Sequence, residues 1–178
     1  MNDLIDVIAL ILIYFLVFFR RWKAKGKDIL LINTVMYVYL CFVMYFTLMP
    51  VITSIPGMFK PKDPDLVLYF NMVPFVDVQL GRGDYFNQIF LNVLMMVPFG
   101  FILPIVRKRG ASFFRTVLYT FLISLGIEIT QLFISIYRSS DITDIITNTT
   151  GGAIGYLFYM VLRPVTTKVL TFLNEKLA

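Results

Sequence analysis

Apolar residues occur along this chain in long, nearly uninterrupted runs separated by short polar stretches. Each run is close to the length that an α-helix needs to cross a bilayer, about 20 residues. The runs predict spans at residues 4–19, 29–52, 86–106, 116–136 and 142–162, of which the first is the shortest. We therefore expect an all-α membrane protein, a bundle of about five transmembrane helices forming a single domain over residues 1–178.

Two segments outside the spans have a pattern of their own. Residues 57–84 form a loop before the third span that is longer than a connection needs, which favours a functional or membrane-surface role. After the fifth span, apolar residues recur every four positions from Val165 to Leu177, which predicts a short amphipathic C-terminal helix on the membrane surface. Within the third span, Pro98 cannot donate to the carbonyl of Leu94, so we expect a kink or a break there.

The basic residues are distributed asymmetrically around the spans. The composition is 58% hydrophobic with a net charge of +5, and the Lys and Arg residues gather after spans one, three and five. Acidic or mixed segments precede span one and follow spans two and four. This is the positive-inside pattern, which predicts an outer N-terminus and an inner C-terminus. It does not indicate a recognition surface, so no nucleic-acid partner is expected.

Missing residue types limit the chemistry. The chain has no histidine and a single cysteine, Cys41, within an apolar run. Histidine-based catalysis, the usual zinc sites, haem ligation by histidine and an intramolecular disulfide are therefore excluded. Any acid–base or metal chemistry must use carboxylates, amides and hydroxyls.

Polar residues gather on both sides of the turn between the fourth and fifth spans, on one helical face in each span. They are Glu128, Gln131 and Ser135 in the fourth span, and Asp141, Asp144 and Asn148 in the fifth. An ionisable group at membrane depth costs roughly 2.5–3.5 kcal/mol on insertion scales unless it is paired or hydrated. Several such groups close together must therefore be arranged against one another.

The predicted topology places further polar residues at the same depth. Asn92 of the third span and Asn71 of the long loop both lie toward the outer leaflet, and Arg138 in the turn is the natural counterion of the acids. One interpretation is a structural ion-pair network that fixes helix register. The other is a solvated pocket that binds a polar head group or a cation.

Small residues in the fifth span predict how it packs. Gly151 and Gly155 are four positions apart, a spacing that lets another helix approach closely. The face shared with Asp144 and Asn148 is then expected to point into the bundle.

These motifs together resemble the VanZ-like family, with a matching region of about residues 35–162. The resemblance rests on Asn71-Met-Val-Pro-Phe75, Asn92, Pro98-Phe99-Gly100, Leu103-Pro104, Ser124, Glu128, Gln131, Arg138, Asp141, Asp144, Asn148, Gly151, Gly152 and Gly155. It implies a multi-pass protein of the bacterial cell membrane. In some members it also implies reduced susceptibility to teicoplanin and related lipoglycopeptides.

Three function classes follow from these residues. In the first, a binding module, Asn71, Asn92, Gln131, Arg138 and Asn148 would hold an envelope-lipid head group, a lipid-linked cell-wall precursor or a lipoglycopeptide. The module would have membrane lipids as neighbours.

In the second, an enzyme acting on a lipid-linked phosphate, Glu128, Asp141 and Asp144 would be catalytic. No resident cofactor is expected, although these carboxylates could hold Mg²⁺ or Ca²⁺. The third class, a transporter, has little support from five spans without an internal repeat, and the oligomeric state stays open.

Overall fold

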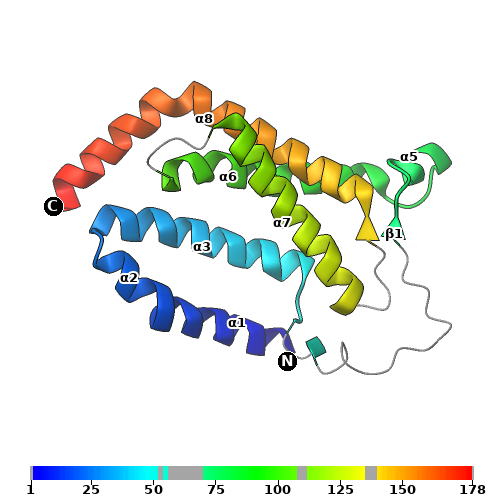
Figure 1. Cartoon of the computed structure of the whole chain (residues 1–178), viewed down its shortest axis with the longest axis horizontal. Coiled ribbons are helices and arrows are strands. Elements are labelled where there is room, and N and C mark those ends of the chain that lie inside the picture. Colours follow the sequence, from blue (N-terminus) through cyan, green and yellow to red (C-terminus); the bar gives the residue numbers. More distant parts are fainter. Residues whose placement is uncertain (1, 52–53, 56–69, 108–111, 135–139, 178) are drawn as a thin grey trace.

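The protein is built almost entirely from helices in its structure, a computed structural model that describes residues 2–51, 54–55, 70–107, 112–134 and 140–177. The helices are α1 (Asn2–Ile13), the π-helical η1 (Tyr14–Phe19), α2 (Arg20–Lys23), α3 (Lys27–Thr47), α5 (Val76–Leu80), α6 (Tyr85–Val106), α7 (Phe113–Ile134) and α8 (Ile142–Leu177) (Figure 1). Two short strands, β1 (Phe70–Asn71) and β2 (Ser140–Asp141), pair in parallel. The predicted all-α membrane class is confirmed.

Four of the described helices are long and apolar enough to cross a membrane. They are α3, α6, α7 and the part of α8 up to Leu173, and they correspond to the predicted second to fifth spans. The predicted first span is also helical, but it consists of α1 and η1, each of which is shorter than a membrane crossing needs. Its crossing of the membrane stays a prediction.

Prolines do not end the helices that contain them. The helix α6 continues through Pro98 and Pro104, so the third span is not broken. The helix α8 continues through Pro164 to Leu177, and the expected separate C-terminal helix is its last part, reached after a change of direction (Figure 1). A proline removes one backbone hydrogen bond, which a membrane helix tolerates when neighbouring helices or Ser and Thr side chains satisfy the freed carbonyl.

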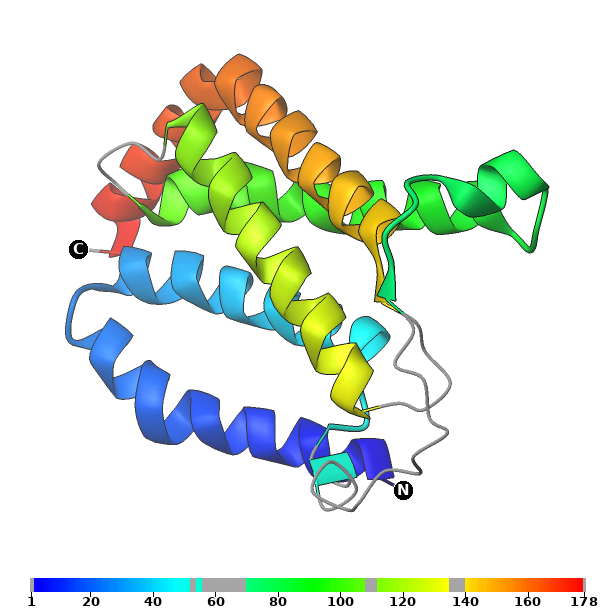
Figure 2. The ribbon, with the colours of Figure 1, turned by 45° about the vertical axis from the view of Figure 1, so that its right-hand side comes forward.

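The two ends of the bundle carry different chemistry. The start of α1, the end of α3 and the strand pair lie toward one end (Figures 1 and 2). The opposite end holds α2, the last turn of α6 and the C-terminus, which are the places where the basic residues gather. The charge pattern predicts that the basic end is cytoplasmic.

The most extensive helix contact joins α6 and α8. A Cβ atom added to Gly151 would overlap the carbonyl oxygen of Val93, and one added to Gly155 would overlap that of Val97. The two backbones therefore touch directly, as the glycine spacing predicts.

Polar residues make up four of the five buried positions of α7, the fifth being Ile127. Thr116, Thr120, Ser124 and Glu128 follow one another every four positions and are at most 1% exposed, whereas Leu118 is half exposed. Outside a bilayer this arrangement would be unfavourable, but lipid is as apolar as a protein core and polar groups must find partners inside the bundle. The apolar core between α3, α6 and α7 consists of Met36, Val43, Met96, Phe99, Leu103 and Ile127.

Candidate functional site

Asp141 connects three separate parts of the fold. It ends β2 opposite Asn71 of β1, whose Nδ2 donates to its Oδ2 at 2.9 Å. Its Oδ1 accepts the backbone N–H of Thr143 at 2.7 Å, which caps the N-terminus of α8. Its own backbone N–H donates to Glu128 Oε2 of α7 at 3.0 Å. Asp141 therefore holds the loop before α5, the end of α7 and the start of α8 together.

Asp144 lies one turn further along α8 and faces α6. Asn92 Nδ2 donates to Asp144 Oδ1 at 2.7 Å, next to the point where the two helix backbones touch. We call Asn71, Asn92, Glu128, Asp141 and Asp144 the outer polar cluster.

The carboxylates of the outer polar cluster are bound by neutral donors. Their partners are side-chain amides and backbone N–H groups, and none forms an ion pair with a described residue. Glu128, Asp141 and Asp144 are close enough for their charges to interact. A neutral donor satisfies an oxygen without cancelling its charge, so none of these contacts supplies the cluster with a counter-charge.

Two of the predicted ligand-binding residues lie away from the cluster. Gln131 Nε2 donates to the carbonyl of Thr47 at the end of α3, at 2.9 Å, and lines a small cavity of about 160 Å³ there. Asn148 Nδ2 donates to Ser124 Oγ at 2.9 Å between α7 and α8, and its side chain is 2% exposed. Another predicted ligand-binding residue, Arg138, lies outside the described residues, so its pairing with the acids stays a prediction.

Thr143 belongs to this region although sequence reasoning did not single it out. Its hydroxyl oxygen accepts the backbone N–H of Phe75 at 2.9 Å, at the residue that precedes α5 and has a φ of 56°. This bond holds the turn before α5 on the first turn of α8. Asp141 is of a residue type preferred directly before a helix, and this helix-start signal could have pointed to Thr143 in the first turn of α8.

The described carboxylates do not form a metal-binding group. No three described acidic residues are placed so that they could hold one ion together. The divalent cation considered for Glu128, Asp141 and Asp144 therefore gains no support from this geometry.

Comparison with known families identifies the chain. The model of the VanZ/LLP1 family matches residues 36–163, a region that contains every residue of the outer polar cluster. The chain belongs to the VanZ/LLP1 family. The resemblance found in its motifs is thereby confirmed, and the VanZ-family chain is a multi-pass membrane protein.

One relative also bears on the VanZ-family chain. That relative is Protein VanZ of Enterococcus faecium, to which this chain is 36% identical over 89 residues. These residues are 50% of this chain and 51% of that protein. The match therefore spans about half the length of the relative. No solved structure matches the chain.

Proposed function

We propose that this VanZ-family chain is a binding protein of the bacterial cell membrane. Its outer polar cluster would hold the head group of an envelope lipid, a lipid-linked cell-wall precursor or a lipoglycopeptide. By binding there it would contribute to reduced susceptibility to teicoplanin-type antibiotics.

The observation that carries the proposal is the convergence of three carboxylates from α7, β2 and α8 at the predicted outer end of the bundle. A purely structural contact at this depth could use neutral side chains at lower cost, because each ionisable group is expensive in a membrane. Amides of Asn71 and Asn92 donate to two of the carboxylates but bring no counter-charge. A head group with amine, amide or hydroxyl donors fits such a site.

The carboxylate-dependent enzyme stays an alternative without an observation in its favour. Hydrolysis or transfer at a phosphate needs an activated nucleophile or a metal ion. The described members of the outer polar cluster are carboxylates and amides, and they do not form a metal-binding group.

The variant Asp144→Asn tests the proposal, because it removes the charge and keeps the shape and the hydrogen bond from Asn92. We expect roughly tenfold weaker binding, since a hydrogen bond to a charged group is worth about 1–1.5 kcal/mol more than a neutral one. Binding of labelled teicoplanin to the purified chain in nanodiscs would be measured. The minimum inhibitory concentration in a susceptible host expressing the chain would be measured as well.

Asp84→Asn is the matched control. Asp84 accepts a hydrogen bond from Asn87 at 2.6 Å at the exposed start of α6, so the same carboxylate–amide pair exists outside the cluster. We expect the control to bind and protect like the unaltered chain at equal protein level. Full binding and resistance in Asp144→Asn, or an equal loss in both variants, would overturn the proposal.

A further inference from the structure

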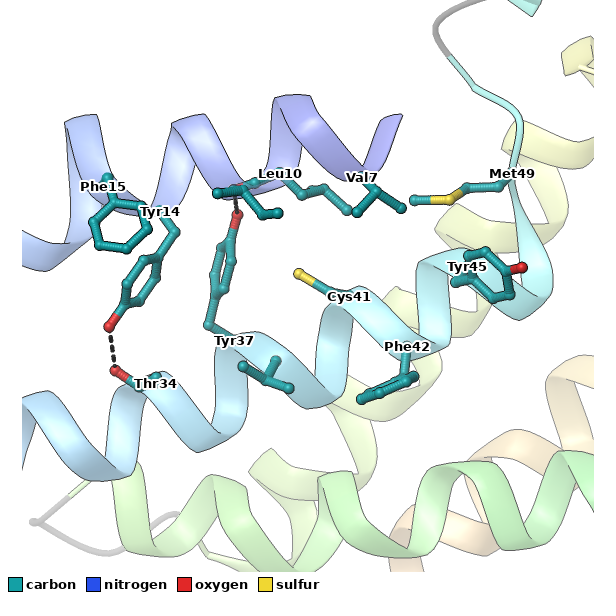
Figure 3. A pocket seen from close by; sticks show the side chains of 12 residues that line it. Val7, Leu10, Tyr14, Phe15, Thr34, Tyr37, Cys41, Phe42, Tyr45 and Met49 are labelled. Atoms are coloured by element: carbon teal, nitrogen blue, oxygen red, sulfur yellow. Dashed lines mark hydrogen bonds between the residues drawn. The ribbon is translucent and has the colours of Figure 1, made fainter. Parts of the chain in front are cut away.

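An apolar cavity of about 340 Å³ lies between α1 and α3, on the side of α3 away from α8 (Figures 1 and 3). We call it the α1–α3 groove. Side chains of both helices line it, among them Val7, Leu10 and Ile11 of α1 and Val38, Cys41 and Phe42 of α3. It lies between two helices that the sequence places within or beside the membrane.

Three of the four hydroxyl groups among the residues that line the groove bind within the protein. Tyr14 Oη and Thr34 Oγ1 share a hydrogen bond of 2.8 Å, and Tyr37 Oη donates to the carbonyl of Leu10 at 2.7 Å (Figure 3). The groove therefore offers hydrocarbon surface without free hydrogen-bonding groups on these side chains. An acyl chain is the ligand chemistry that such a surface accommodates.

One end of the groove leads to a basic segment. Tyr14, Phe15 and Thr34 line that end, and beyond it the chain turns through α2 into α3. The basic residues of this turn are all exposed: Arg20, Arg21, Lys23, Lys25 and Lys27, which we call the basic hinge. Asp28 is the one acidic residue that follows directly.

An aromatic residue joins the basic hinge to the groove. Trp22, between two basic residues of the hinge, stacks on Phe18 at a centroid distance of 4.9 Å. The Trp22 ring also lies 6.2 Å from that of Tyr37, which lines the groove. Tryptophan is typical of the membrane–water interface, where head groups meet acyl chains. The basic hinge thus lies where the head group of a lipid would be, and the apolar groove lies where its acyl chain would be.

We propose that the α1–α3 groove and the basic hinge form a binding site for an anionic glycerophospholipid. One acyl chain lies in the groove and the phosphate-bearing head group contacts the hinge. Clusters of basic residues at the cytoplasmic end of a membrane helix attract anionic lipids, whereas a second copy of the chain would bring a like-charged hinge. No residue that lines the groove belongs to the outer polar cluster, and the hinge and α1 precede the family-matched region, so this site is separate from the one proposed above.

The single tryptophan of the chain makes the site measurable. The full chain would be reconstituted in nanodiscs of zwitterionic lipid that contain a small fraction of phosphatidylglycerol brominated near the head-group end of its chains. Bromine quenches the fluorescence of Trp22 on contact. Compared with equally brominated phosphatidylcholine, we expect quenching that corresponds to roughly tenfold enrichment of the anionic lipid. High salt should reduce the difference.

Two sets of variants separate the head-group and acyl-chain contacts. Removing three of the five positive charges of the hinge by Arg20→Gln, Arg21→Gln and Lys25→Gln should strongly reduce the preference for the anionic lipid. The matched control neutralises three exposed basic residues of α8 and should keep it: Arg163→Gln, Lys168→Gln and Lys176→Gln.

Filling the groove by Cys41→Phe should lower quenching by both lipids. Val38→Phe, at a more exposed lining position, serves if the first variant fails to fold. Equal quenching of the unaltered chain by the two lipids, an unchanged preference in the triple hinge variant, or undiminished quenching in a folded groove-filling variant would overturn the proposal.

Discussion

The contact between α6 and α8 can be tested by adding one methyl group at Gly151. The added Cβ would overlap the carbonyl oxygen of Val93 and lie 3.1 Å from the Cβ of Met96. Neither obstacle can rotate away, because one is backbone and the other is the first atom of its side chain. The variant Gly151→Ala must therefore push the two helices apart.

The cost follows from two opposing effects. Overpacking a close contact costs about 1–3 kcal/mol. Replacing glycine by alanine inside a helix returns about 0.5–1 kcal/mol through its better helix propensity. We expect a net loss of about 0.5–2 kcal/mol in the free energy of unfolding. The hydrogen bond from Asn92 to Asp144, beside Val93, should weaken as well.

The free energy of unfolding would be measured in mixed micelles by titration with a denaturing detergent, with circular dichroism as the signal. Gly126→Ala is the matched control, because Gly126 lies in α7 with nothing within 4 Å of an added Cβ. It should gain about 0.5–1 kcal/mol from helix propensity alone. If Gly151→Ala is as stable as Gly126→Ala, α6 and α8 are not in backbone contact and the reasoning is refuted.

Two further changes test single hydrogen bonds around the bundle. Tyr39→Phe removes the donor to the carbonyl of Met95, at 2.7 Å, and should lower the free energy of unfolding by about 0.5–1.5 kcal/mol, whereas Tyr45→Phe on the exposed face should not. A similar loss in both would contradict the assignment. Asn71→Leu removes the donor to Asp141 and should speed limited proteolysis between residues 72 and 84, unlike Gln88→Leu at an exposed position of α6. Unchanged cleavage would show that this bond does not hold the loop.

Much of the outer polar cluster follows from helical spacing and topology. The predicted orientation of the spans places Asn71, Asn92, Glu128, Asp141 and Asp144 at one membrane depth, and the structure brings them together. Depth can be inferred from sequence because it depends on the distance from each helix end along the chain.

The direction in which each side chain points is a different matter. Gln131 is three positions after Glu128, which places the two side chains about 60° apart around the helix. That difference aims Glu128 at the start of α8 and Gln131 at the end of α3. Asn148 likewise faces α7, where Ser124 binds it, while Asp144 faces α6. Rotation of a helix about its axis is set by its neighbours, so a spacing pattern alone could not separate these partners.

The sequence by itself determined the membrane class, four of the helices, the close packing at Gly151 and Gly155, and the chemistry that the missing histidines exclude. These properties depend on local composition and on periodicity along one segment, which do not require knowledge of a partner. Only the tertiary structure decided that β1 pairs with β2, that neutral donors bind the carboxylates, and that an apolar groove ends at the basic hinge. Each of these joins segments that are far apart in the chain, and their meeting depends on helix tilt and rotation, which packing sets.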